Sequence, residues 1–330
     1  MRTKKRRYFK YIAIVLAAVL LITAALALLE LWEKGQGRFP ESETDGGILE
    51  YNGTKYVRRD GIETFLVLGL DKFDGQETAD SHESGVQTDF LMLFVFDNSA
   101  HTCTALQINR DTVTRVNKLS VGGATVVDTY NKQIALAYNY VNDDNAKIRC
   151  GNTKSSVEYL LNGVKVDHYM ALTMDAVPAI NDFVGGVEVT VNDDFTGIDA
   201  ALVKGATVTL HGEQALTYVR TRYGLEDASN TTRMERQRQY LGALYNRAVE
   251  RSAADEAFAA DLVSAVNEYV VYDSADERML KLVEKLNEYE YLGIRELSGE
   301  SKTVDGFVEF YPDEGALREL VLELFYTPKA

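Results

Sequence analysis

Five arginines occur within the 19 residues from 220 to 238 of a chain that is otherwise strongly acidic. The planar guanidinium group of arginine can bind two phosphate oxygens at once through parallel hydrogen bonds. A cluster of this kind therefore predicts a site for a phosphorylated ligand. The arginines are Arg220, Arg222, Arg233, Arg236 and Arg238.

Part of this cluster falls within a helix that we expect over residues 231–251. Positions three and four apart share a helix face, so Arg233, Arg236 and Gln237 are expected to face a ligand together. Arg238 lies off that face and is expected in solvent. The alternative is a solvated helix whose arginines pair with neighbouring carboxylates, those of Glu226, Asp227 and Glu235.

Carboxylates and a further arginine stand at the ends of apolar segments that we expect to be strands. Arg110 and Asp111 end one such segment, and ligands gather at strand ends in α/β folds. The alternative for this pair is a surface ion pair. Asp71 and Asp89 also stand at strand edges, where a carboxylate beside arginines suggests Mg²⁺ shared with phosphate oxygens. Either aspartate alone could be an ordinary strand-end residue.

The overall charge argues against nucleic-acid binding. Six of the 35 basic residues lie within the first ten positions, which leaves 29 basic against 50 acidic residues, a net charge of −21. Such a surface repels phosphate backbones. No nucleophile elbow, P-loop or zinc-ligand spacing occurs in the sequence. Cys103 and Cys150 leave two alternatives open, a disulfide or two buried thiols.

Apolar runs of strand length and helical patterns alternate along the chain, which predicts an α/β fold with helices covering both faces of a sheet. A tight polar turn joins the second and third runs, which suggests an antiparallel pair. Strands are expected at 64–70, 88–98, 102–108 and 185–191, the last after a glycine turn. Helices are expected at 131–141, 153–162, 173–183, 212–220, 231–251, 253–268, 275–287 and 314–326.

The N-terminus has the pattern of a membrane anchor. Residues 11–31 are apolar except for Thr23 and Glu30, and about 20 such residues span a bilayer. The basic segment 1–10 is expected to stay in the cytoplasm, which puts the rest of the chain outside. A cleaved signal peptide is the alternative, but its apolar region would be shorter.

The ordered motifs behind this apolar segment resemble the LytR–CpsA–Psr family of cell-envelope proteins, over residues 62–250. No single string is decisive, but their order and spacing together are specific. The strings are TFLVLGLD, QTDFLMLFVFD, LQINRDT, NDFVGGVEVTV, LHGEQALTYVRTR and RMERQRQ.

The resemblance implies an α/β/α sandwich with a central mixed sheet and an apolar tunnel for a polyprenyl chain, preceded by one transmembrane helix. The expected parts are a basic cytoplasmic tail (1–10), the anchor (11–31), a stalk and lead-in (32–60), a catalytic domain (61–250) and a C-terminal α/β extension (251–330).

Members of this family are phosphotransferases that move glycopolymers, such as teichoic acids and capsular polysaccharides, from a polyprenyl-phosphate carrier to peptidoglycan. The resemblance therefore implies a single-pass membrane enzyme with an extracellular domain and Mg²⁺ as cofactor. Its expected partners are a polyprenyl-pyrophosphate-linked glycopolymer, peptidoglycan and membrane lipid. The alternatives are a binding module without transfer activity and a lipid pyrophosphatase.

The resemblance also assigns roles to individual residues. Asp89 matches the magnesium-associated aspartate, and Arg110 and Asp111 match the arginine–aspartate pair of the active site. The residues expected to grip the pyrophosphate are Arg220, Arg222, Arg233, Gln237 and Arg236.

Three positions depart from the family's pattern. Asn109 stands where proline is common, Asn230 where an aspartate is usual, and Gln133 where a basic residue is usual, with Lys132 one position earlier. We expect these departures to affect metal affinity or rate more than the fold.

Overall fold

The computed structural model describes residues 48–72, 86–273 and 288–329. Contacts between Cα atoms divide the chain into two units, and residues 59–326 form the larger one. The expected anchor, 11–31, and the helix expected at 275–287 lie outside the described residues. No helix within the described ranges combines the length and apolarity needed to cross a bilayer.

The smaller unit is built around a β-hairpin. Strands β1 (Ile48–Tyr51) and β2 (Thr54–Arg58) pair antiparallel, and β15 (Tyr326–Pro328) lies beside β2. The two residues between β1 and β2, Asn52 and Gly53, have φ angles of 50° and 76°. Positive φ at both turn positions suits the right-handed twist of a two-residue hairpin, which explains the Asn-Gly pair.

A six-stranded mixed sheet forms the centre of the larger unit, in the order β11-β8-β3-β4-β5-β12. The β3–β4 and β4–β5 pairs are antiparallel, as the tight turn between β4 and β5 predicts, whereas β3–β8 and β5–β12 are parallel. The strands are β3 (Ile62–Leu70), β4 (Thr88–Asp97), β5 (Thr102–Ile108), β8 (His168–Thr173), β11 (Val270–Tyr272) and β12 (Glu290–Glu296).

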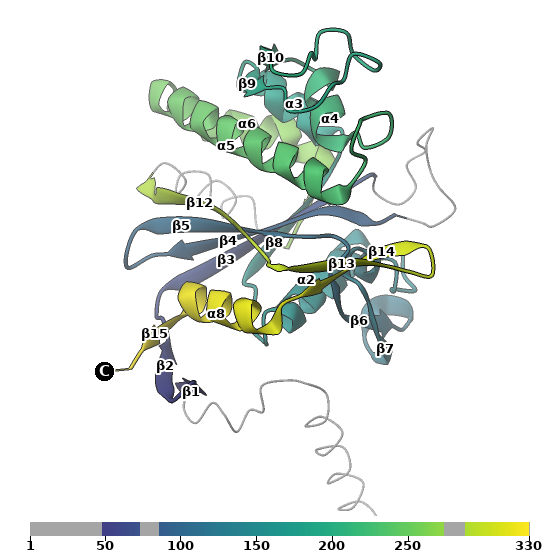
Figure 1. Ribbon diagram of the computed structural model, residues 1–330. Coiled ribbons are helices and arrows are strands. Elements are labelled where there is room, and N and C mark those ends of the chain that lie inside the picture. Colours follow the sequence, from purple (N-terminus) through teal and green to yellow (C-terminus); the bar gives the residue numbers. More distant parts are fainter. Residues whose placement is uncertain (1–47, 73–85, 274–287, 330) are drawn as a thin grey trace, which may run out of the picture. The chain divides into compact units, whose positions relative to one another are not determined.

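Helices cover both faces of this sheet (Figure 1), as expected from its near-continuous apolar strands. Side chains alternate between the faces, so Leu66 and Leu93 join the buried core on the side of α2 (Ala146–Leu160) and α8 (Glu314–Phe325). Facing the other way are α3 (Ala176–Phe183), α4 (Glu213–Arg220), α5 (Asn230–Ala254) and α6 (Phe258–Val266).

A second hydrophobic core lies among α3, α4, α5 and the hairpin of β9 (Val187–Thr190) and β10 (Thr207–Leu210). The expected turn before β9 is present, since Gly185 and Gly186 have φ angles of 87° and 92°. A Cβ atom at Gly186 would lie 2.7 Å from the side chain of His211, so only glycine fits there.

The helix expected at 131–141 is wrong. Residues 126–133 instead form β7 (Val126–Gln133), which pairs antiparallel with β6 (Val113–Leu119), and only a short 3₁₀ turn, Ile134–Tyr138, follows. Cross-strand pairing along the whole of β6 overrides the local helical pattern.

The segment after residue 250 does not form an appended layer. Its strands β11 and β12 close both edges of the central sheet, and α8 packs into the core beneath it. Between β12 and α8, β13 (Gly299–Val304) and β14 (Phe307–Pro312) form an antiparallel hairpin. Parallel pairing of β12 with β5 joins positions nearly 190 apart, a contact that no local pattern reveals.

The two cysteines are free thiols, both buried. They lie in different cores, Cys103 with Phe65 and Phe96 and Cys150 with the residues under α2. Burial raises the pKa of Cys103 and of Cys150 to about 12, which makes both thiols unreactive. The disulfide alternative is therefore wrong.

Candidate active site

Three strands bring their polar end residues to one edge of the sheet. Because β4 runs antiparallel to β3 and β5, its first residues lie beside the last residues of both neighbours, with Leu70 opposite Thr88 and Leu91 opposite Ile108. Asp89 therefore lies close to both strand ends, as the sequence predicts. The residues after those ends are Asp71, Arg110 and Asp111.

Arg110 is the centre of this group. Its guanidinium pairs with the Asp89 carboxylate through Nη1, donates to the Gln87 side-chain oxygen through Nη2, and places Nε 3.5 Å from Oδ1 of Asp111. Burial lowers the pKa of Arg110, while the Asp111 carboxylate opposes that shift. Nothing in the sequence singled out Gln87, which merely precedes an apolar strand.

Asp111 is 7% exposed and lies among cations. Burial raises the pKa of its carboxyl group, and the charges of Arg110, Arg233 and Arg222 act in the opposite direction. Its Oδ1 also accepts a hydrogen bond from Nε2 of Gln133 at 3.3 Å. Gln133 thus reaches the site despite its departure from the family's pattern.

Helix α5 presents Arg233 to the same place. The Ser229 side chain caps the helix by accepting a hydrogen bond from the Thr232 N–H at 3.2 Å, which fixes the first turn. Arg233 is 4% exposed, and its Nε makes no hydrogen bond to any described residue. Burial, then the charges of Arg222 and Arg110, lower the pKa of Arg233 to about 9.

The charge of Arg233 is only partly compensated, because the Asp111 carboxylate favours its charged form while neighbouring arginines oppose it. Among the described residues, its guanidinium head donates one hydrogen bond, from Nη2 to Oδ1 of Asn230 at 2.6 Å. A buried charge without a full set of partners is costly, and two neighbouring arginines increase the cost. An anion bound here would lower that cost, because it would supply both charge and hydrogen-bond acceptors.

The other two predicted arginines extend from α4. Arg220 ends the helix, is 42% exposed, and places Nη2 3.6 Å from Oδ1 of Asp71. Arg222 follows in the next loop, with its guanidinium 5.4 Å from the ring centroid of Tyr223, and its charge acts on both Arg110 and Arg233. The structure therefore brings together Arg110, Arg222 and Arg233, with Arg220 beside Asp71.

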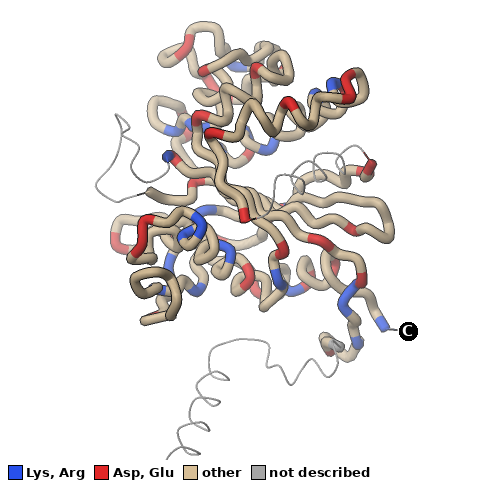
Figure 2. Tube along the Cα trace, turned by 180° about the vertical axis from the view of Figure 1, so that it is seen from behind, with Lys and Arg blue, Asp and Glu red and all other residues tan. Residues whose placement is uncertain are grey.

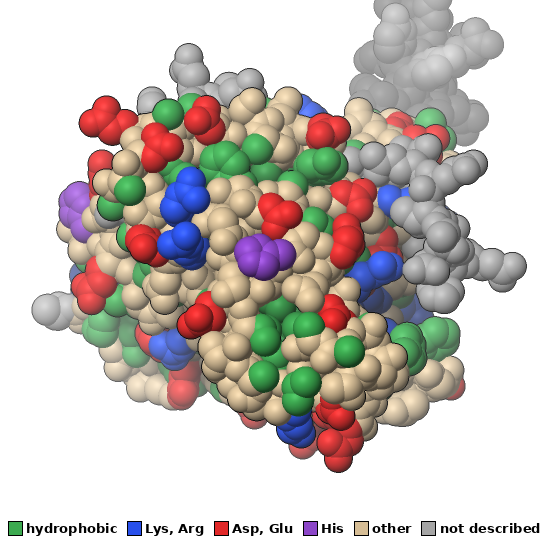
Figure 3. All heavy atoms as spheres, turned by 90° about the horizontal axis from the view of Figure 1, so that it is seen from above, with side chains coloured by type: hydrophobic (Ala, Val, Ile, Leu, Met, Phe, Trp, Pro, Cys, Tyr) green, Lys and Arg blue, Asp and Glu red, His purple; other side chains and the backbone are tan. Residues whose placement is uncertain are grey.

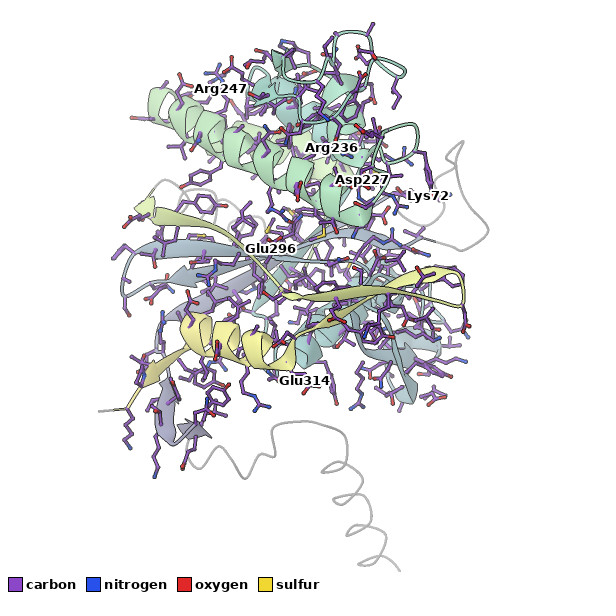
Figure 4. All side chains as sticks on the ribbon, in the orientation of Figure 1. Lys72, Asp227, Arg236, Arg247, Glu296 and Glu314 are labelled. Carbon is purple, nitrogen blue, oxygen red and sulfur yellow. The ribbon has the colours of Figure 1, made fainter. Side chains whose placement is uncertain are left out.

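Arg236 does not join them, contrary to expectation. It is fully buried, and it pairs with Oδ2 of Asp193 at 2.5 Å and donates to the carbonyl oxygens of Tyr218 (3.0 Å) and Thr221. Figure 4 shows it within the α5 layer. Because Thr221 separates Arg220 from Arg222, Arg236 holds the segment that carries both.

Arg238 is also different from expectation, since it is not a solvated side chain. Its Nη1 lies 2.8 Å from both Gln107 Oε1 and Glu296 Oε2, which connects α5 to the end of β12. Gln107 in turn donates to Gln237 Oε1 at 3.3 Å. Gln237 is thereby fixed beside Arg233, as the helical spacing predicts.

An apolar cavity of about 350 Å³ opens from this group into the space between the sheet and α5. Phe65, Met92 and Phe94 form part of its wall, whereas Leu91 and Leu93 face the opposite core. The sequence left open whether such residues line a tunnel or fill a core. Both occur, because successive side chains along a strand point to opposite faces of the sheet. The polar residues at the cavity are Asp89, Arg220, Arg233, Gln237 and Thr173.

The carboxylates at this edge suit a hard cation only in part. Oδ1 of Asp71 and Oδ1 of Asp89 are buried, and each is paired with an arginine. Within the described part of the chain, no three His, Cys, Asp or Glu residues gather closely enough to hold a metal. Mg²⁺ commonly binds one or two carboxylates together with substrate oxygens, and these residues fit that pattern.

Charged residues of both signs are spread over the described part of the molecule. Figure 2 shows acidic positions interspersed with basic ones along the chain trace, and Figure 3 shows side chains of both signs on one face. The arginines that converge at the cavity are therefore a local concentration of positive charge in a chain whose overall composition is acidic.

Comparison with known proteins gives a consistent result. The model of the LytR_cpsA_psr family matches residues 41–325. The chain is 25% identical over 288 residues to the cell wall biosynthesis protein LcpA of Corynebacterium glutamicum, covering 78% of this chain and 55% of LcpA. It is 24% identical over 301 residues to the polyisoprenyl-teichoic acid–peptidoglycan teichoic acid transferase TagU of Bacillus mycoides, covering 84% of this chain and 91% of TagU.

The chain spans 55% to 59% of the length of two curated relatives, LcpA among them. A solved structure of TagT bound to LI-WTA superposes with a TM-score of 0.59 at 21% identity, over 80% of this chain and 90% of TagT. At that identity the likeness shows a shared fold, a mixed α/β architecture with a central mixed sheet.

Proposed function

Since the chain belongs to the LytR–CpsA–Psr family, we propose that it transfers a glycopolymer from a polyprenyl-pyrophosphate carrier to peptidoglycan. The arginines and aspartates at the ends of β3, β4 and β5, together with Arg233, would hold the pyrophosphate. The apolar cavity would hold the beginning of the polyprenyl chain. Two similar proteins support this choice, because TagU is a teichoic acid transferase and TagT was solved bound to LI-WTA.

One observation carries the proposal. Arg233 lines an apolar cavity and is buried; this burial, and then the charges of two neighbouring arginines, lower its pKa. Asp111 offsets only part of this unfavourable burial, so an added anion would stabilise the guanidinium, and the adjoining apolar wall suits a hydrocarbon chain. A polyprenyl pyrophosphate carries both groups in one molecule.

The residues divide the chemistry among them. Arg110, Arg222 and Arg233 would bind the pyrophosphate oxygens and stabilise the negative charge of the transition state, while Arg220 would act at the cavity mouth. Asp111, whose carboxyl pKa burial raises, is our candidate for accepting the proton of the attacking sugar hydroxyl. Polyprenyl phosphate would leave along the apolar cavity.

Magnesium belongs to the proposal as well. Asp89, with Asp71 beside it, would hold Mg²⁺ together with phosphate oxygens. A bound Mg²⁺ neutralises phosphate charge and favours departure of the leaving group. The side chain of Arg110 already pairs with Asp89, so this arginine would orient the carboxylate toward the pyrophosphate.

We also propose that residues 11–31 anchor the enzyme in the membrane, with the N-terminus in the cytoplasm and the catalytic unit outside. The lipid carrier moves in the plane of the membrane, so an anchored enzyme would encounter it by lateral diffusion. The acidic surface then presents no obstacle, because long-range attraction of the anionic substrate is not required.

A transfer assay tests the proposal. The full chain in detergent would be given a short-chain polyprenyl-pyrophosphate-linked saccharide, Mg²⁺ and peptidoglycan. Arg233→Ala should lower transfer at least about tenfold, since losing a buried phosphate-binding arginine costs about 2–5 kcal/mol. Arg247→Ala, on the same helix but paired with Glu250, is the matched control.

The same assay separates the alternatives. Phosphate release without peptidoglycan, unaffected by adding it, would indicate a lipid pyrophosphatase. Tight binding of the lipid without turnover would indicate a binding module. Equal transfer by the wild type and Arg233→Ala would contradict the assignment of the site.

A further inference from the structure

A second cavity, of about 380 Å³, lies beside the first turns of α5 and differs in character from the apolar one. Its walls come from distant parts of the chain: the residue after β5, the helix α5, the end of β12 and the β13–β14 hairpin. Much of this wall comes from residues after 250. The polar residues that line it are Asn109, Thr231, Arg238, Glu296, Ser298 and Ser301.

The chemistry of this cavity suits an uncharged, hydroxyl-rich ligand. Among the described residues that line it, only Arg238 and Glu296 are charged, and they pair with each other at 2.8 Å. Their charges cancel, so the cavity has no net attraction for an anion, yet both groups still offer hydrogen bonds. Figure 4 shows Glu296 at the end of β12, below α5.

One wall of the cavity carries the aromatic ring of Phe310. The ring of Phe310 lies so close to Gly299 that a Cβ atom there would be 2.7 Å from Cζ of the ring. Ser301 lies directly opposite Phe310 in the β13–β14 pairing, so its side chain shares the same face of the hairpin. An aromatic ring edged by hydroxyl and amide groups is a combination that matches the apolar face and polar rim of a sugar ring.

A chain of hydrogen bonds links the second cavity to the first. Asn109 lines the polar cavity and accepts a hydrogen bond from Asn230 at 2.8 Å, and Asn230 accepts one from Arg233, which lines the apolar cavity. Phe310 donates its backbone N–H to the carbonyl oxygen of Asp111 at 2.8 Å. Hydrogen bonds therefore connect the lining of the polar cavity both to Arg233 and to Asp111.

Phosphoryl transfer places the attacking and leaving oxygens roughly in line, on opposite sides of the phosphorus. If the leaving polyprenyl phosphate occupies the apolar cavity, the nucleophile must approach from another direction. The two cavities contact different faces of α5, one through Arg233, Gln237 and Leu241 and the other through Thr231, Met234 and Arg238.

From these observations we propose that the polar cavity is the subsite for the acceptor glycan, binding the uncharged N-acetylhexosamine backbone of peptidoglycan and presenting a sugar hydroxyl toward Asp111. The inference rests on the proposed function, because it assigns the acceptor of that same reaction. It also assigns a function to the C-terminal segment, since residues at the end of β12 and in β13 and β14 form much of the subsite.

Direct binding tests this inference without requiring turnover. Uncharged β-1,4-linked N-acetylglucosamine oligosaccharides would be titrated into the full-length protein by calorimetry. Ser301→Trp, which places a large ring over Phe310 at an exposed strand position, should weaken binding about tenfold by filling the cavity. Thr303→Trp, on the same strand but outside the cavity wall, should bind like the wild type.

A second variant examines the chemistry rather than the shape. Glu296→Gln keeps the volume but removes the charged acceptor, and it should weaken oligosaccharide binding several-fold while leaving binding of a polyprenyl pyrophosphate unchanged. Failure of the wild type to bind the oligosaccharide, or equal binding by Ser301→Trp, would overturn the inference. If the donor lipid displaced the oligosaccharide, the cavity would hold the donor's own sugars, which also contradicts it.

The two proposals fail in different ways. The wild type could bind the oligosaccharide, with weaker binding by Ser301→Trp, and yet show no transfer. That result would contradict the proposed function but not the glycan-binding site. Transfer that Ser301→Trp leaves unchanged, with an unaltered KM for peptidoglycan, would contradict the acceptor subsite alone.

Discussion

The side-chain amide of Asn230 donates to Oδ1 of Asn109 at 2.8 Å, which joins the start of α5 to the residue that precedes Arg110. The Asn230 oxygen accepts from Arg233 at 2.6 Å, and Oδ1 of Asn109 also accepts from the Asp111 N–H at 2.9 Å. Two residues that depart from the family's pattern are thus direct partners. A proline at 109 would lack this acceptor, and an aspartate at 230 would lack the donor.

We expect these two asparagines to act as a unit. Asn109→Ala and Asn230→Ala should each slow transfer, because each leaves a buried partner unsatisfied, at a cost of about 1–3 kcal/mol. The double variant should cost clearly less than the sum, as for residues that share one hydrogen bond. Additive losses in a double-mutant cycle on kcat/KM would show that the pair is not coupled.

Asn230→Asp gives a separate test of the same contact. The new carboxylate would face Oδ1 of Asn109, so that acceptor would oppose acceptor, even though it would neutralise Arg233. We therefore expect lower stability in urea unfolding than for the wild type. Combining it with Asn109→Ser, which supplies a hydroxyl donor, should recover part of the loss.

Arg233 is expected to support transfer while it lowers the stability of the protein without ligand. Its guanidinium is buried and incompletely paired, and burial lowers its pKa to about 9. Arg233→Met should keep the volume, abolish most transfer and raise the free energy of unfolding in the absence of ligand. Chemical denaturation measures the second effect. A destabilised Arg233→Met protein would show that the charge is already well compensated without a phosphate.

Asp111 should make stability depend on pH. Burial raises the pKa of its carboxyl group above the ordinary 3.8, so between the two values the folded state binds more protons than the unfolded state. The free energy of unfolding contributed by this group therefore falls as pH rises through that window. Asp111→Asn removes the effect, so its stability relative to the wild type should increase from about pH 4 upward.

The rate of transfer should also depend on the ionisation of Asp111, but it should rise with pH where the stability falls. If Asp111 accepts the proton of the attacking hydroxyl, transfer requires the ionised carboxylate and should rise with pH through its raised pKa. The measurement is a pH profile of kcat for the wild type and for Gln133→Leu, which loses the hydrogen bond to Oδ1. That bond favours the ionised carboxylate, so the profile of the variant should move to higher pH. Identical profiles would argue against Asp111 as the base.

The sequence allowed good prediction of the elements with strong apolar patterns and poor prediction of the others. β3, β4 and β5 are nearly continuous apolar runs because both of their faces are covered. The hairpins β6–β7 and β13–β14 carry no such pattern, because β6 is mostly half-buried and the other three strands are largely exposed, so the sequence does not predict them. Parallel pairing of β12 with β5 depends on long-range contacts, which explains the mistaken separation of the last 80 residues.

The site shows the same division. Strand ends correctly placed Asp89 near Arg110 and Asp111, because antiparallel neighbours bring opposite ends together. Helical spacing put Arg236 on the face of Arg233, but spacing says nothing of the partner that a side chain meets. Arg236 meets Asp193, which lies 43 residues earlier. The assigned phosphate-binding roles of Arg220, Arg222, Arg233 and Gln237 stay predictions.

The apolar cavity should determine affinity for the hydrocarbon part of the donor. Leu241→Trp fills space along the wall from α5, whereas Asn246→Trp adds the same ring on an exposed position of that helix. Each methylene removed from water contributes about 0.8 kcal/mol, so a longer polyprenyl pyrophosphate should raise the melting temperature of the wild type more than a short one. Leu241→Trp should lose this chain-length dependence, and Asn246→Trp should retain it. The same dependence in both variants would place the lipid elsewhere.

Magnesium should bind measurably only in the presence of the pyrophosphate. Asp71 and Asp89 provide buried oxygens, yet each is paired with an arginine whose charge repels a cation. Two carboxylates opposed by two guanidinium groups hold a divalent ion weakly, so substrate oxygens must complete the site. Titrating Mg²⁺ alone should therefore give no saturable heat below millimolar concentrations, while adding a short-chain polyprenyl pyrophosphate should give a saturable signal.

Asp89→Asn should raise the Mg²⁺ concentration needed for half-maximal transfer about tenfold or more, whereas Asp97→Asn, at the far end of the same strand, should not. Full transfer by the wild type in the presence of a chelator would remove the metal from the mechanism and leave charge neutralisation to the arginines.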